Sequence, residues 1–302
     1  MLTPDDVRFF QQIAAEGSLA GAARMLGVTP PAITLRLQQI EKKLGVRLID
    51  RSTRRMHLTD EGQLLRDSGR GILAQLDALG EQLSSRKGLV AGELRLRAPL
   101  GFGRRYVAPA LLRFRRRHPN VVVSLALSDR PGRQYDDAND IVIHIGALPD
   151  SSRVAIKLAP NRRYLCAAPA YLKGVAPLRV PADLGRCECL VLRENDEDVT
   201  LWRFRRARVT QAVRVRAAMS SNDGSVVRDW ALQAAGVLVR SEWDVAGDLR
   251  ARRLVRLLPD YDMEHADIVA LIAHAKGVSA RVREFCAFLK AELTPTPWRT
   301  ES

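Results

Sequence analysis

The sequence predicts an α+β chain of several domains: a small helical N-terminal module, one long helix, and a C-terminal α/β domain. Three observations support this fold class. Short, well-capped helices fill residues 1–59, an apolar heptad repeat runs through residues 60–86, and strand-like segments alternate with helix-like segments from Gly92 onward. We therefore expect three parts, residues 1–59, 60–90 and 91–302, in a chain of 302 residues.

The composition favours a polyanionic partner. The chain has 48 Lys and Arg against 34 Asp and Glu, a net charge of +14, and neutralisation of phosphates by such side chains drives nucleic-acid binding. An arginine-rich surface can also be merely solvated. Residues 1–58 hold nine Lys and Arg and five Asp and Glu, a net of +4, so the bulk charge does not locate a binding site.

Other broad classes are disfavoured. No run of eighteen apolar residues exists, so no membrane span is expected. The N-terminus lacks the apolar core of a signal peptide, and four cysteines are too few for a disulfide framework in a chain of this length. We expect a cytoplasmic protein with free thiols.

The first two helices are defined by their ends. Thr3 is placed to cap a helix with Pro4 at its first position, and Gly17 ends that helix. Ser18 then caps a second helix, and Gly27 ends it in the left-handed conformation that a tight turn requires.

A third helix follows, with Thr29 as its N-cap and Pro30 at its first position. Its periodicity gives one apolar face, made of Ile33, Leu37, Ile40 and Leu44. The opposite face carries Pro31, Leu35, Gln38 and Lys42, with Ala32 and Gln39 beside them. The pattern predicts a helix-turn-helix whose third helix places the N-terminal half of this polar face in a DNA major groove.

Two short strands, residues 46–51 and 56–58, are expected to form a wing beside this helix. Arg51, Arg54 and Arg55 cluster at the turn between the strands. A single loop arginine is usually only solvated, but three at one turn beside a helix-turn-helix favour contact with backbone phosphates.

The long helix is expected to begin after Thr59 and to run to about residue 86. Its apolar residues recur at heptad spacing, with a gap at Gly69: Leu65, Ile72, Leu76, Leu79 and Leu83. This spacing favours pairing between two chains, which palindromic recognition requires. The alternative is a helix that packs only on its own domain.

The remaining sequence predicts a sheet covered by helices. Expected strands are residues 93–98, 121–127, 140–146, 153–158, 164–167, 190–193, 211–219, 236–239 and 268–273; expected helices are 107–118, 225–235 and 279–292; the tail, 294–302, is expected to fray. Ligands in such sheets bind beyond strand ends and next to helix N-termini, which here means residues 99–103 and 220–224.

With these residues assigned, the chain resembles the LysR-type transcriptional regulators over essentially its whole length. The segments that carry the resemblance are EGSLAGAARMLGVTPPAIT, LQQIEKKLGVRLIDR, LTDEG, GELRLRAPLGFGRR, HIGALPDSS, LCAAPAYL, SNDG and RLVRLLPDY. The resemblance implies an effector-binding domain like the periplasmic binding proteins, with subdomain I at about 91–160 plus 265–302 and subdomain II at about 161–264. It also implies a small-molecule effector between them, a homodimer or homotetramer on double-stranded DNA, and RNA polymerase as a candidate partner.

The recognition helix departs from the family pattern. The family usually has Ser-Gln-Pro there, followed by Ser-Arg; this chain has Thr29, Pro30 and Pro31, followed by Thr34 and Leu35. Pro30 cannot donate the hydrogen bonds of a glutamine, and Leu35 cannot make a bidentate contact with guanine. We expect Ala32 and Leu35 to contact thymine methyls, the alternative being a Leu35 that touches only sugar and backbone. The expected DNA contacts are Ser18, Thr29, Pro30, Pro31, Ala32, Thr34, Leu35, Arg36 and Gln39, with Arg51, Arg54 and Arg55 on phosphates.

In the effector domain, the resemblance places Leu100, Gly101 and Phe102 where family members contact ligand. Gly101 stands where a hydroxyl residue is frequent, so the backbone amides of this loop would serve instead. His144 and Gly146 follow a strand and are expected in the same cleft, although a lone histidine there is more often buried and hydrogen-bonded. Ser221, Asn222, Asp223 and Trp202 complete the expected site, while capping of the next helix is an alternative role for Asn222 and Asp223. An organic anion, such as a carboxylate, is the expected ligand.

Catalytic chemistry is not indicated. We find no nucleophile–base pair, no phosphate loop and no metal-ligand cluster, since Cys187 and Cys189 lack a second pair at ligand spacing. We therefore expect no catalytic residue, no metal and no cofactor. The alternative to a ligand-responsive regulator is a small-molecule-binding protein or enzyme of the periplasmic-binding-protein fold with an accessory N-terminal domain.

Overall fold

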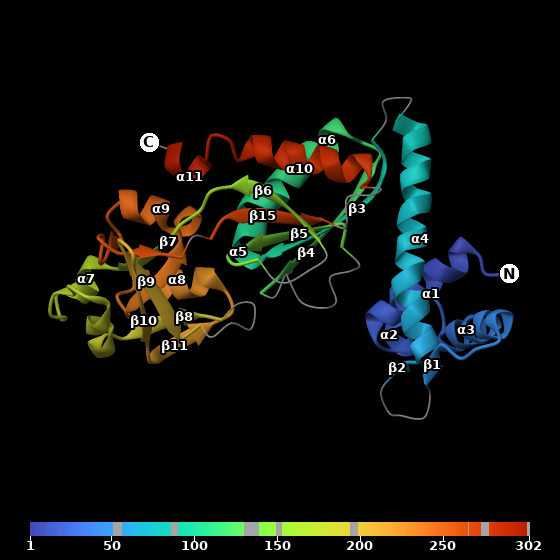
Figure 1. Ribbon diagram of the computed structural model, residues 1–302, viewed down its shortest axis with the longest axis horizontal. Helices are drawn as coiled ribbons and strands as arrows, with labels where there is room; N and C mark the ends of the chain where they lie inside the picture. The colour runs from blue at the N-terminus through green and yellow to red at the C-terminus, as the bar shows by residue number, and fades with distance from the viewer. Residues whose placement is uncertain are drawn as a thin grey trace. The chain divides into compact units, whose positions relative to one another are not determined.

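The computed structural model describes residues 1–50, 56–85, 90–129, 139–148, 153–193, 199–264, 266–272 and 278–300. The chain folds as two compact units, Met1–Gly88 and Leu89–Ser302 (Figure 1). Each unit has its own apolar core. Within the described ranges, no helix combines the length and the apolar character that a membrane crossing requires.

Three helices build the N-terminal unit: α1 (Pro4–Glu16), α2 (Leu19–Leu26) and α3 (Pro30–Leu44). The predicted caps are confirmed at Thr3 and Ser18, whose hydroxyl oxygens accept the amides of Asp6 and Gly21 at 3.2 and 3.0 Å. The expected cap at Thr29 is wrong in one respect, because its side chain makes no capping hydrogen bond. Pro31, at the second helical position, has no amide hydrogen, which removes one of the two donors that such a cap would satisfy.

The wing is framed by β1 (Ile49–Asp50) and β2 (His57–Leu58), an antiparallel pair in which Ile49 lies opposite Leu58. The first strand is therefore shorter than the expected 46–51. The predicted core face of α3 is confirmed, since Ile33, Leu37 and Ile40 are fully buried. They pack with Phe10 and Ile13 of α1.

The long helix, α4 (Asp60–Ser85), begins as predicted with the Thr59 hydroxyl accepting the Gly62 amide at 3.0 Å. Its first turns pack on its own domain, where Leu65, expected in a seam between chains, contacts the N-terminal core. Gly69 is a point of close approach, since a Cβ there would lie 2.6 Å from Cγ1 of Val7 on α1.

Subdomain I of the C-terminal unit is built on a five-stranded sheet of order β4-β3-β5-β15-β6 in the described residues. Its strands are β3 (Gly92–Pro99), β4 (Val121–Ser128), β5 (Ile141–Ile145), β6 (Val154–Ala159) and β15 (Ile268–Ile272). β3 is parallel to β4 and β5, and β15 is antiparallel to β5 and β6. The helices α6 (Ala108–Arg117) and α10 (Ala280–Glu292) pack on it (Figure 1).

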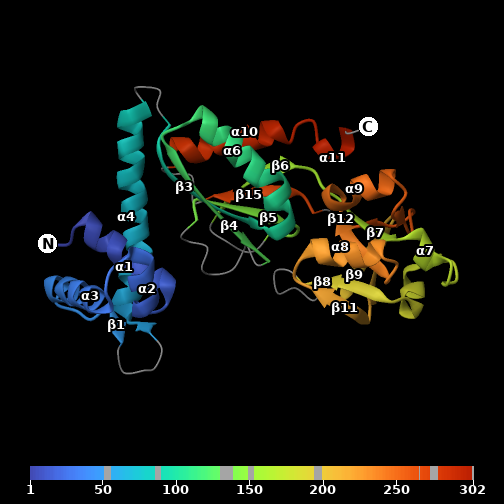
Figure 2. The same cartoon turned by 180° about the vertical axis from the view of Figure 1, so that it is seen from behind.

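Subdomain II contains a second five-stranded sheet, of order β11-β8-β12-β7-β13 in the residues described. Its strands are β7 (Arg163–Ala167), β8 (Cys189–Leu192), β11 (Ala217–Ser221), β12 (Val237–Ser241) and β13 (Val255–Arg256). Its α-helices are α7 (Pro169–Leu172), α8 (Gly224–Leu232) and α9 (Glu242–Arg250) (Figure 2). It also contains the 3-10 helix η3 (Pro181–Arg186). A smaller antiparallel sheet joins β10 (Val209–Arg214), β9 (Leu201–Arg206) and β14 (Asp262–Met263).

Three expectations for this unit are wrong. The stretch 99–103 is not a loop: Pro99 ends β3, and α5 (Leu100–Phe102) follows at once and runs into the π-helical turn η1 (Gly103–Val107). Its glycines serve close packing: a Cβ on Gly103 would lie 2.3 Å from Cδ2 of Leu127. The segment 211–219 is two strands, β10 and β11, that belong to different sheets, and β9 was not expected at all.

The C-terminal tail is the third correction, because it is ordered through α11 (Pro297–Thr300). Trp298 is buried against Phe102 and Tyr106. Arg299 donates two hydrogen bonds to the Glu242 carboxylate, at 2.8 and 2.7 Å. The sequence of the tail alone could not predict these contacts, because its prolines suggest a frayed end and its partners lie far away in the chain.

Candidate DNA interface and ligand cleft

The outward face of α3 presents a mixed apolar and polar surface. Leu35 is 58% exposed, and the other exposed residues predicted on or beside this face are Pro31, Ala32, Gln38, Gln39 and Lys42. Pro30 and Thr29 are also exposed at the helix start, and Ser18 is exposed at the start of α2. Because Ile33, Leu37 and Ile40 pack into the core on the opposite face, this set lies on the outward surface of α3.

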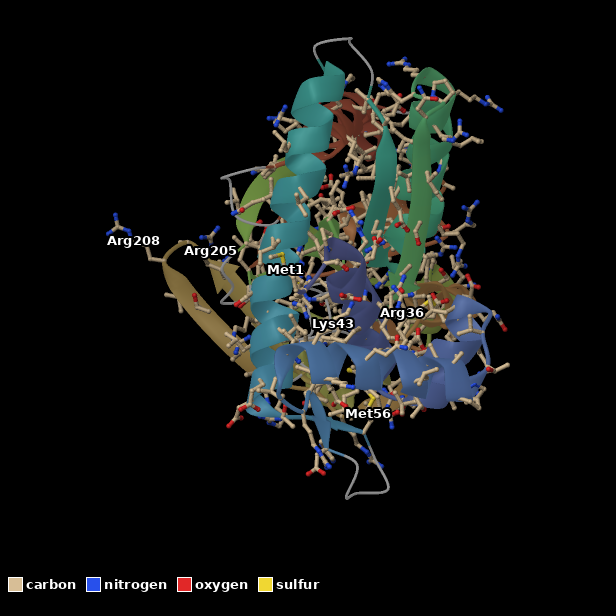
Figure 3. The ribbon with its side chains drawn as sticks, turned by 90° about the vertical axis from the view of Figure 1, so that its right-hand side faces the viewer. Met1, Arg36, Lys43, Met56, Arg205 and Arg208 are labelled. Atoms are coloured by element: carbon tan, nitrogen blue, oxygen red, sulfur yellow. The ribbon has the colours of Figure 1, made fainter. Side chains whose placement is uncertain are left out.

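Two hydrogen-bonding groups predicted for DNA are engaged within the protein. The Thr34 hydroxyl donates to the Pro30 carbonyl at 3.1 Å, which leaves only its acceptor lone pairs for a ligand. The Arg36 guanidinium lies over the Phe9 ring, with Cζ 4.4 Å from the ring centroid. Figure 3 shows Arg36 and Lys43 on the side of α3 that faces α1. Arg36 is thus held beside α1 rather than on the face that carries Leu35.

A residue pair that was not predicted from the sequence links α1 to α3. Lys43 Nζ lies 2.8 Å from the Asp6 carboxylate, whose side chain is 9% exposed. The hydrogen bond from Lys43 holds the pKa of Asp6 below its usual value, helped by the hydroxyl and amide of Thr3. The capping pattern Thr3–Asp6 was visible in the sequence, but the distant lysine was not.

The wing arginines Arg51, Arg54 and Arg55 lie outside the described residues. The segment before them is described. The Glu41 carboxylate accepts hydrogen bonds from the amides of Leu48 and Ile49, at 2.9 and 3.4 Å, and so links the end of α3 to β1.

Beyond the packed part of α4, an apolar stripe is exposed. Ile72, Leu76 and Leu79 are 51%, 40% and 53% exposed. The side chain of Leu83 lies outside the described side chains. The exposed part of the predicted heptad stripe thus follows Gly69 in the described residues.

A cleft of about 420 Å³ lies between the two subdomains of the C-terminal unit. Subdomain I contributes Pro99 and Gly101, at the end of β3, and Ile145 and Ala147, at the end of β5. Subdomain II supplies the other wall, including Arg163, Trp202, Arg203, Arg240, Ser241, Trp243 and Glu264. The placement at strand ends is the one predicted for ligand binding in such folds.

The cations of the cleft differ in their partners. Arg203 lies 3.6 Å from Glu264, and the buried Arg240 makes a two-point contact with Asp244, at 2.9 and 2.6 Å. Arg163 has no carboxylate partner among the described residues. Its guanidinium passes beside Gly146, where φ is +117° and a Cβ would lie 3.1 Å from Nη2. Gly146 therefore makes room for an arginine in the cleft instead of lining the cleft itself.

Of the predicted effector contacts, Gly101 and Trp202 line the cleft. Leu100 does not, and Phe102 is fully buried among aromatic rings, because the helical turn at α5 points it into the core. His144 is buried as well, with Nε2 hydrogen-bonded to the Ala147 carbonyl, which was the alternative weighed for it.

Ser221, Asn222 and Asp223 do not line the cleft but stand beside it. Asn222 donates to the Asp129 carboxylate at 3.0 Å, and Arg104 lies 3.4 Å from Asp223, so both link the two subdomains. Asp223 also caps α8 by accepting the Ser225 amide at 2.8 Å, which confirms the alternative role. Burial acts to raise the pKa of Asp223, but these hydrogen bonds and Arg104 together lower it.

The expected effector contacts did not include the three arginines of the cleft wall, Arg163, Arg203 and Arg240. Arginine is so abundant in this chain that no single one stands out in the sequence. Only the structure connects Gly224 with Arg240: a Cβ on Gly224 would lie 2.2 Å from Nη2 of that arginine.

Two kinds of reactive group, a bound metal ion and an activated thiol, were looked for among the described residues. The searched part of the chain holds no group of three His, Cys, Asp or Glu residues placed to hold a metal ion. All four cysteines are buried thiols. Burial raises the pKa of Cys166, Cys189 and Cys286 to about 12, so none of these three supplies a thiolate nucleophile near neutral pH.

Comparisons with known proteins give a family match for the N-terminal unit and another for the C-terminal unit. Residues 4–63 match the family described as "Bacterial regulatory helix-turn-helix protein, lysR family", and residues 87–294 match "LysR substrate binding domain". The HTH-type transcriptional activator TtdR of Escherichia coli (strain UTI89 / UPEC) is 35% identical over 287 residues, which cover 95% of this chain and 92% of TtdR. The HTH-type transcriptional regulator DmlR of Escherichia coli K12 is 32% identical over 286 residues, covering 95% and 93%.

Solved structures share the whole fold. The virulence activator AphB of Vibrio cholerae aligns at full length with a TM-score of 0.63, 22% identity, and coverage of 96% of this chain and 99% of that one. CrgA, a LysR-type transcriptional regulator from Neisseria meningitidis, aligns with a TM-score of 0.60, 25% identity, and coverage of 97% and 99%. With a helix-turn-helix and a ligand cleft both matched along nearly the whole chain, this protein belongs to the LysR family of bacterial transcriptional regulators.

Proposed function

We propose that this regulator reads its operator mainly through the outward face of α3 and responds to a small organic anion bound in the cleft between its subdomains. The observation that carries the ligand class is Arg163, a half-buried cation that lines the cleft and has no carboxylate partner among the described residues. Arg203 and Arg240 line the same wall, but each is paired with a carboxylate, Glu264 and Asp244 respectively, so Arg163 is the cation that the described lining leaves for an anion.

In the DNA half, Ala32 and Leu35 are proposed to contact thymine methyls. The supporting observation is the exposure of Leu35 on a face where Pro30 and Pro31 present no amide donors. Arg51, Arg54 and Arg55 would hold the wing on the phosphate backbone. Such a site depends on methyl contacts and DNA shape more than on base hydrogen bonds.

For the assembly, we propose that α4 pairs with its counterpart in a second chain through Ile72, Leu76 and Leu79. Their exposure on one face supports this, as does the symmetry that paired half-sites demand. The working form would be a homodimer or a homotetramer.

The ligand proposal is tested by a thermal-shift screen of small carboxylates against neutral compounds of similar size, using the full chain. We expect a carboxylate to raise the melting temperature, and Arg163→Gln to weaken its binding at least tenfold, since a charge-assisted hydrogen bond is lost. The control is Arg193→Gln, an exposed arginine outside the cleft lining. A clear response to a neutral compound, with none to any acid, would overturn the ligand class.

A further inference from the structure

A second hollow, of about 450 Å³, lies on subdomain II and shares no lining residue with the cleft. Its rim carries Lys173, which follows α7, and Arg252 and Arg253, which follow α9, while Pro169 and Leu232 form part of its apolar wall. No carboxylate is among its lining residues. We propose that this basic hollow is a second binding site, for a small phosphate or carboxylate anion, and that it is coupled to the cleft.

The cations of the basic hollow are available to a ligand. Lys173 and Arg252 are exposed and have no ion-pair partner within the described ranges. Arg252 also adopts φ = +55°, a left-handed conformation that glycine or asparagine takes more readily after a helix. The chain therefore keeps a guanidinium at a position where the backbone alone would favour another residue.

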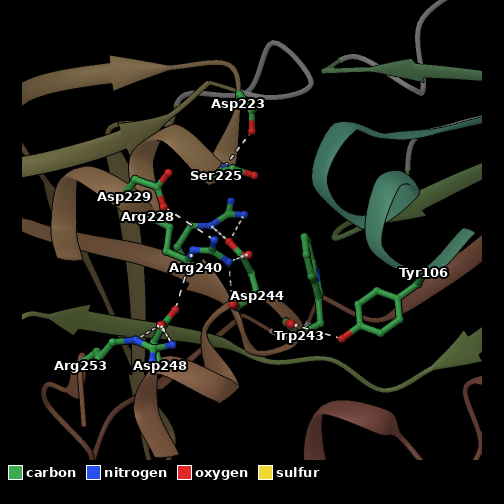
Figure 4. A network of polar contacts seen from close by, with 10 residues as sticks. All are labelled: Tyr106, Asp223, Ser225, Arg228, Asp229, Arg240, Trp243, Asp244, Asp248 and Arg253. Atoms are coloured by element: carbon green, nitrogen blue, oxygen red, sulfur yellow. Dashed lines mark hydrogen bonds and ion pairs between the residues drawn. The ribbon is translucent and has the colours of Figure 1, made fainter. Parts of the chain in front are cut away.

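A chain of alternating charges joins the basic hollow to the cleft (Figure 4). Arg253 Nη2 lies 2.7 Å from Asp248 Oδ1, and Asp248 Oδ2 lies 3.8 Å from Nε of Arg228. Arg228 Nη1 lies 2.8 Å from Asp244 Oδ1, and Asp244 Oδ2 lies 2.6 Å from Nη2 of Arg240. Arg253 lines the basic hollow and Arg240 lines the cleft, so the two ends of one network face the two sites.

The network gives a physical route for coupling. An anion bound to Arg253 competes with Asp248 for that guanidinium. The ion pair between Asp248 and Arg228 then becomes stronger, and the ion pair between Arg228 and Asp244 becomes weaker. Asp244 and Asp248 are about 95% buried, so water cannot compensate either carboxylate fully. The change is passed to Arg240, and by linkage an anion in the cleft alters the basic hollow to the same extent. This coupling rests on the proposed function of the cleft, whereas the second site itself does not.

The site is tested by calorimetric titration of the full chain with inorganic phosphate and, separately, with acetate. We expect binding of at least one of them and a loss of at least tenfold in affinity in the double variant Lys173→Gln, Arg252→Gln. The matched control is Arg179→Gln, Arg216→Gln, which removes the same charge from exposed positions of subdomain II outside both cavities. The cleft variant Arg163→Gln should retain binding at the basic hollow, because Arg163 is not among the residues that line it.

The coupling is read from the indole ¹⁵N–¹H signal of Trp243, whose ring centroid is 5.9 Å from Cζ of Arg240. We expect the bound anion to shift this signal in the wild type and in the control, but not in the Lys173→Gln, Arg252→Gln variant. The second site would be overturned if neither anion bound the full chain. It would also be overturned if the control variant lost as much affinity as the Lys173→Gln, Arg252→Gln variant, or if affinity were lost only in Arg163→Gln. Binding at the basic hollow with an unmoved Trp243 signal would overturn the coupling. Neither result depends on the carboxylate screen that tests the cleft.

Discussion

Gly224 and Arg240 share one small space: a Cβ on Gly224 would lie 2.2 Å from Nη2 and 2.4 Å from Cζ of the Arg240 guanidinium. Gly224 is the first residue of α8, and Arg240 is the buried partner of Asp244. The absence of a side chain at 224 is thus what lets the guanidinium reach both the cleft and the charge network.

We predict that Gly224→Ala lowers the free energy of unfolding by about 2–4 kcal/mol, because it displaces Arg240 and leaves a buried carboxylate poorly paired. Urea unfolding measures this difference, provided that the slope of the unfolding free energy against urea concentration is unchanged. Gly247→Ala is the matched control: it lies in α9 with nothing within 4 Å of its Cβ, and should stabilise by about 0.5–1 kcal/mol. Equal effects of the two substitutions would contradict the proposed crowding.

Leu35→Ala should weaken operator binding by about threefold to tenfold, since a partly buried methyl contact contributes about 1 kcal/mol. It should also relax the preference for A·T at the contacted position. Fluorescence anisotropy with operator variants measures both quantities. Leu112→Ala, at a residue 55% exposed on α6, is the control. Unchanged affinity and base preference would mean that Leu35 touches only sugar and backbone.

Ile72→Asp should dissociate the pairing of α4, because it buries a charge in the proposed seam. Analytical ultracentrifugation at micromolar concentration should show a smaller species. The control is Leu64→Asp: Leu64 is 67% exposed and lies about 80° round the helix from Ile72. A dimer that survives Ile72→Asp and dissociates with Leu64→Asp would place the seam on another face.

The thiols should be inert in the native protein. Cys166, Cys189 and Cys286 have pKa values raised to about 12 by burial, so at pH 8 the thiolate fraction is very small. Alkylation with iodoacetamide should therefore proceed only as fast as the chain opens, and should speed up in urea. A cysteine among these three that reacts at the rate of a free thiol would point to a redox role.

Local signals in the sequence predicted much of the fold. Thr3 and Ser18 cap helices within their own next turn, and the core face of α3 follows from spacing alone. The site was harder to predict, because burial depends on distant partners. Phe102 is enclosed by Trp243 and Trp298, far along the chain, and Gly101 is crowded by that same Trp243.

Charged residues show the same limit. The sequence cannot distinguish Arg163, which faces the cleft without a carboxylate partner in the described chain, from Arg299, which is paired with Glu242. The hairpin of β9 and β10 was missed for a related reason: Trp202 and Phe204 alternate with arginines, yet their burial comes from the core of subdomain II.

The most direct test of the account is selection of genomic DNA fragments by the full chain, followed by binding assays on the selected sequence with Ala32→Glu and Ala15→Glu. Both alanines are exposed, one beside the outward face of α3 and one on α1. We predict that Ala32→Glu lowers affinity at least a hundredfold, because a carboxylate in the groove meets phosphates, while Ala15→Glu binds as the wild type does. Retained binding by Ala32→Glu would contradict the claim that α3 reads the operator.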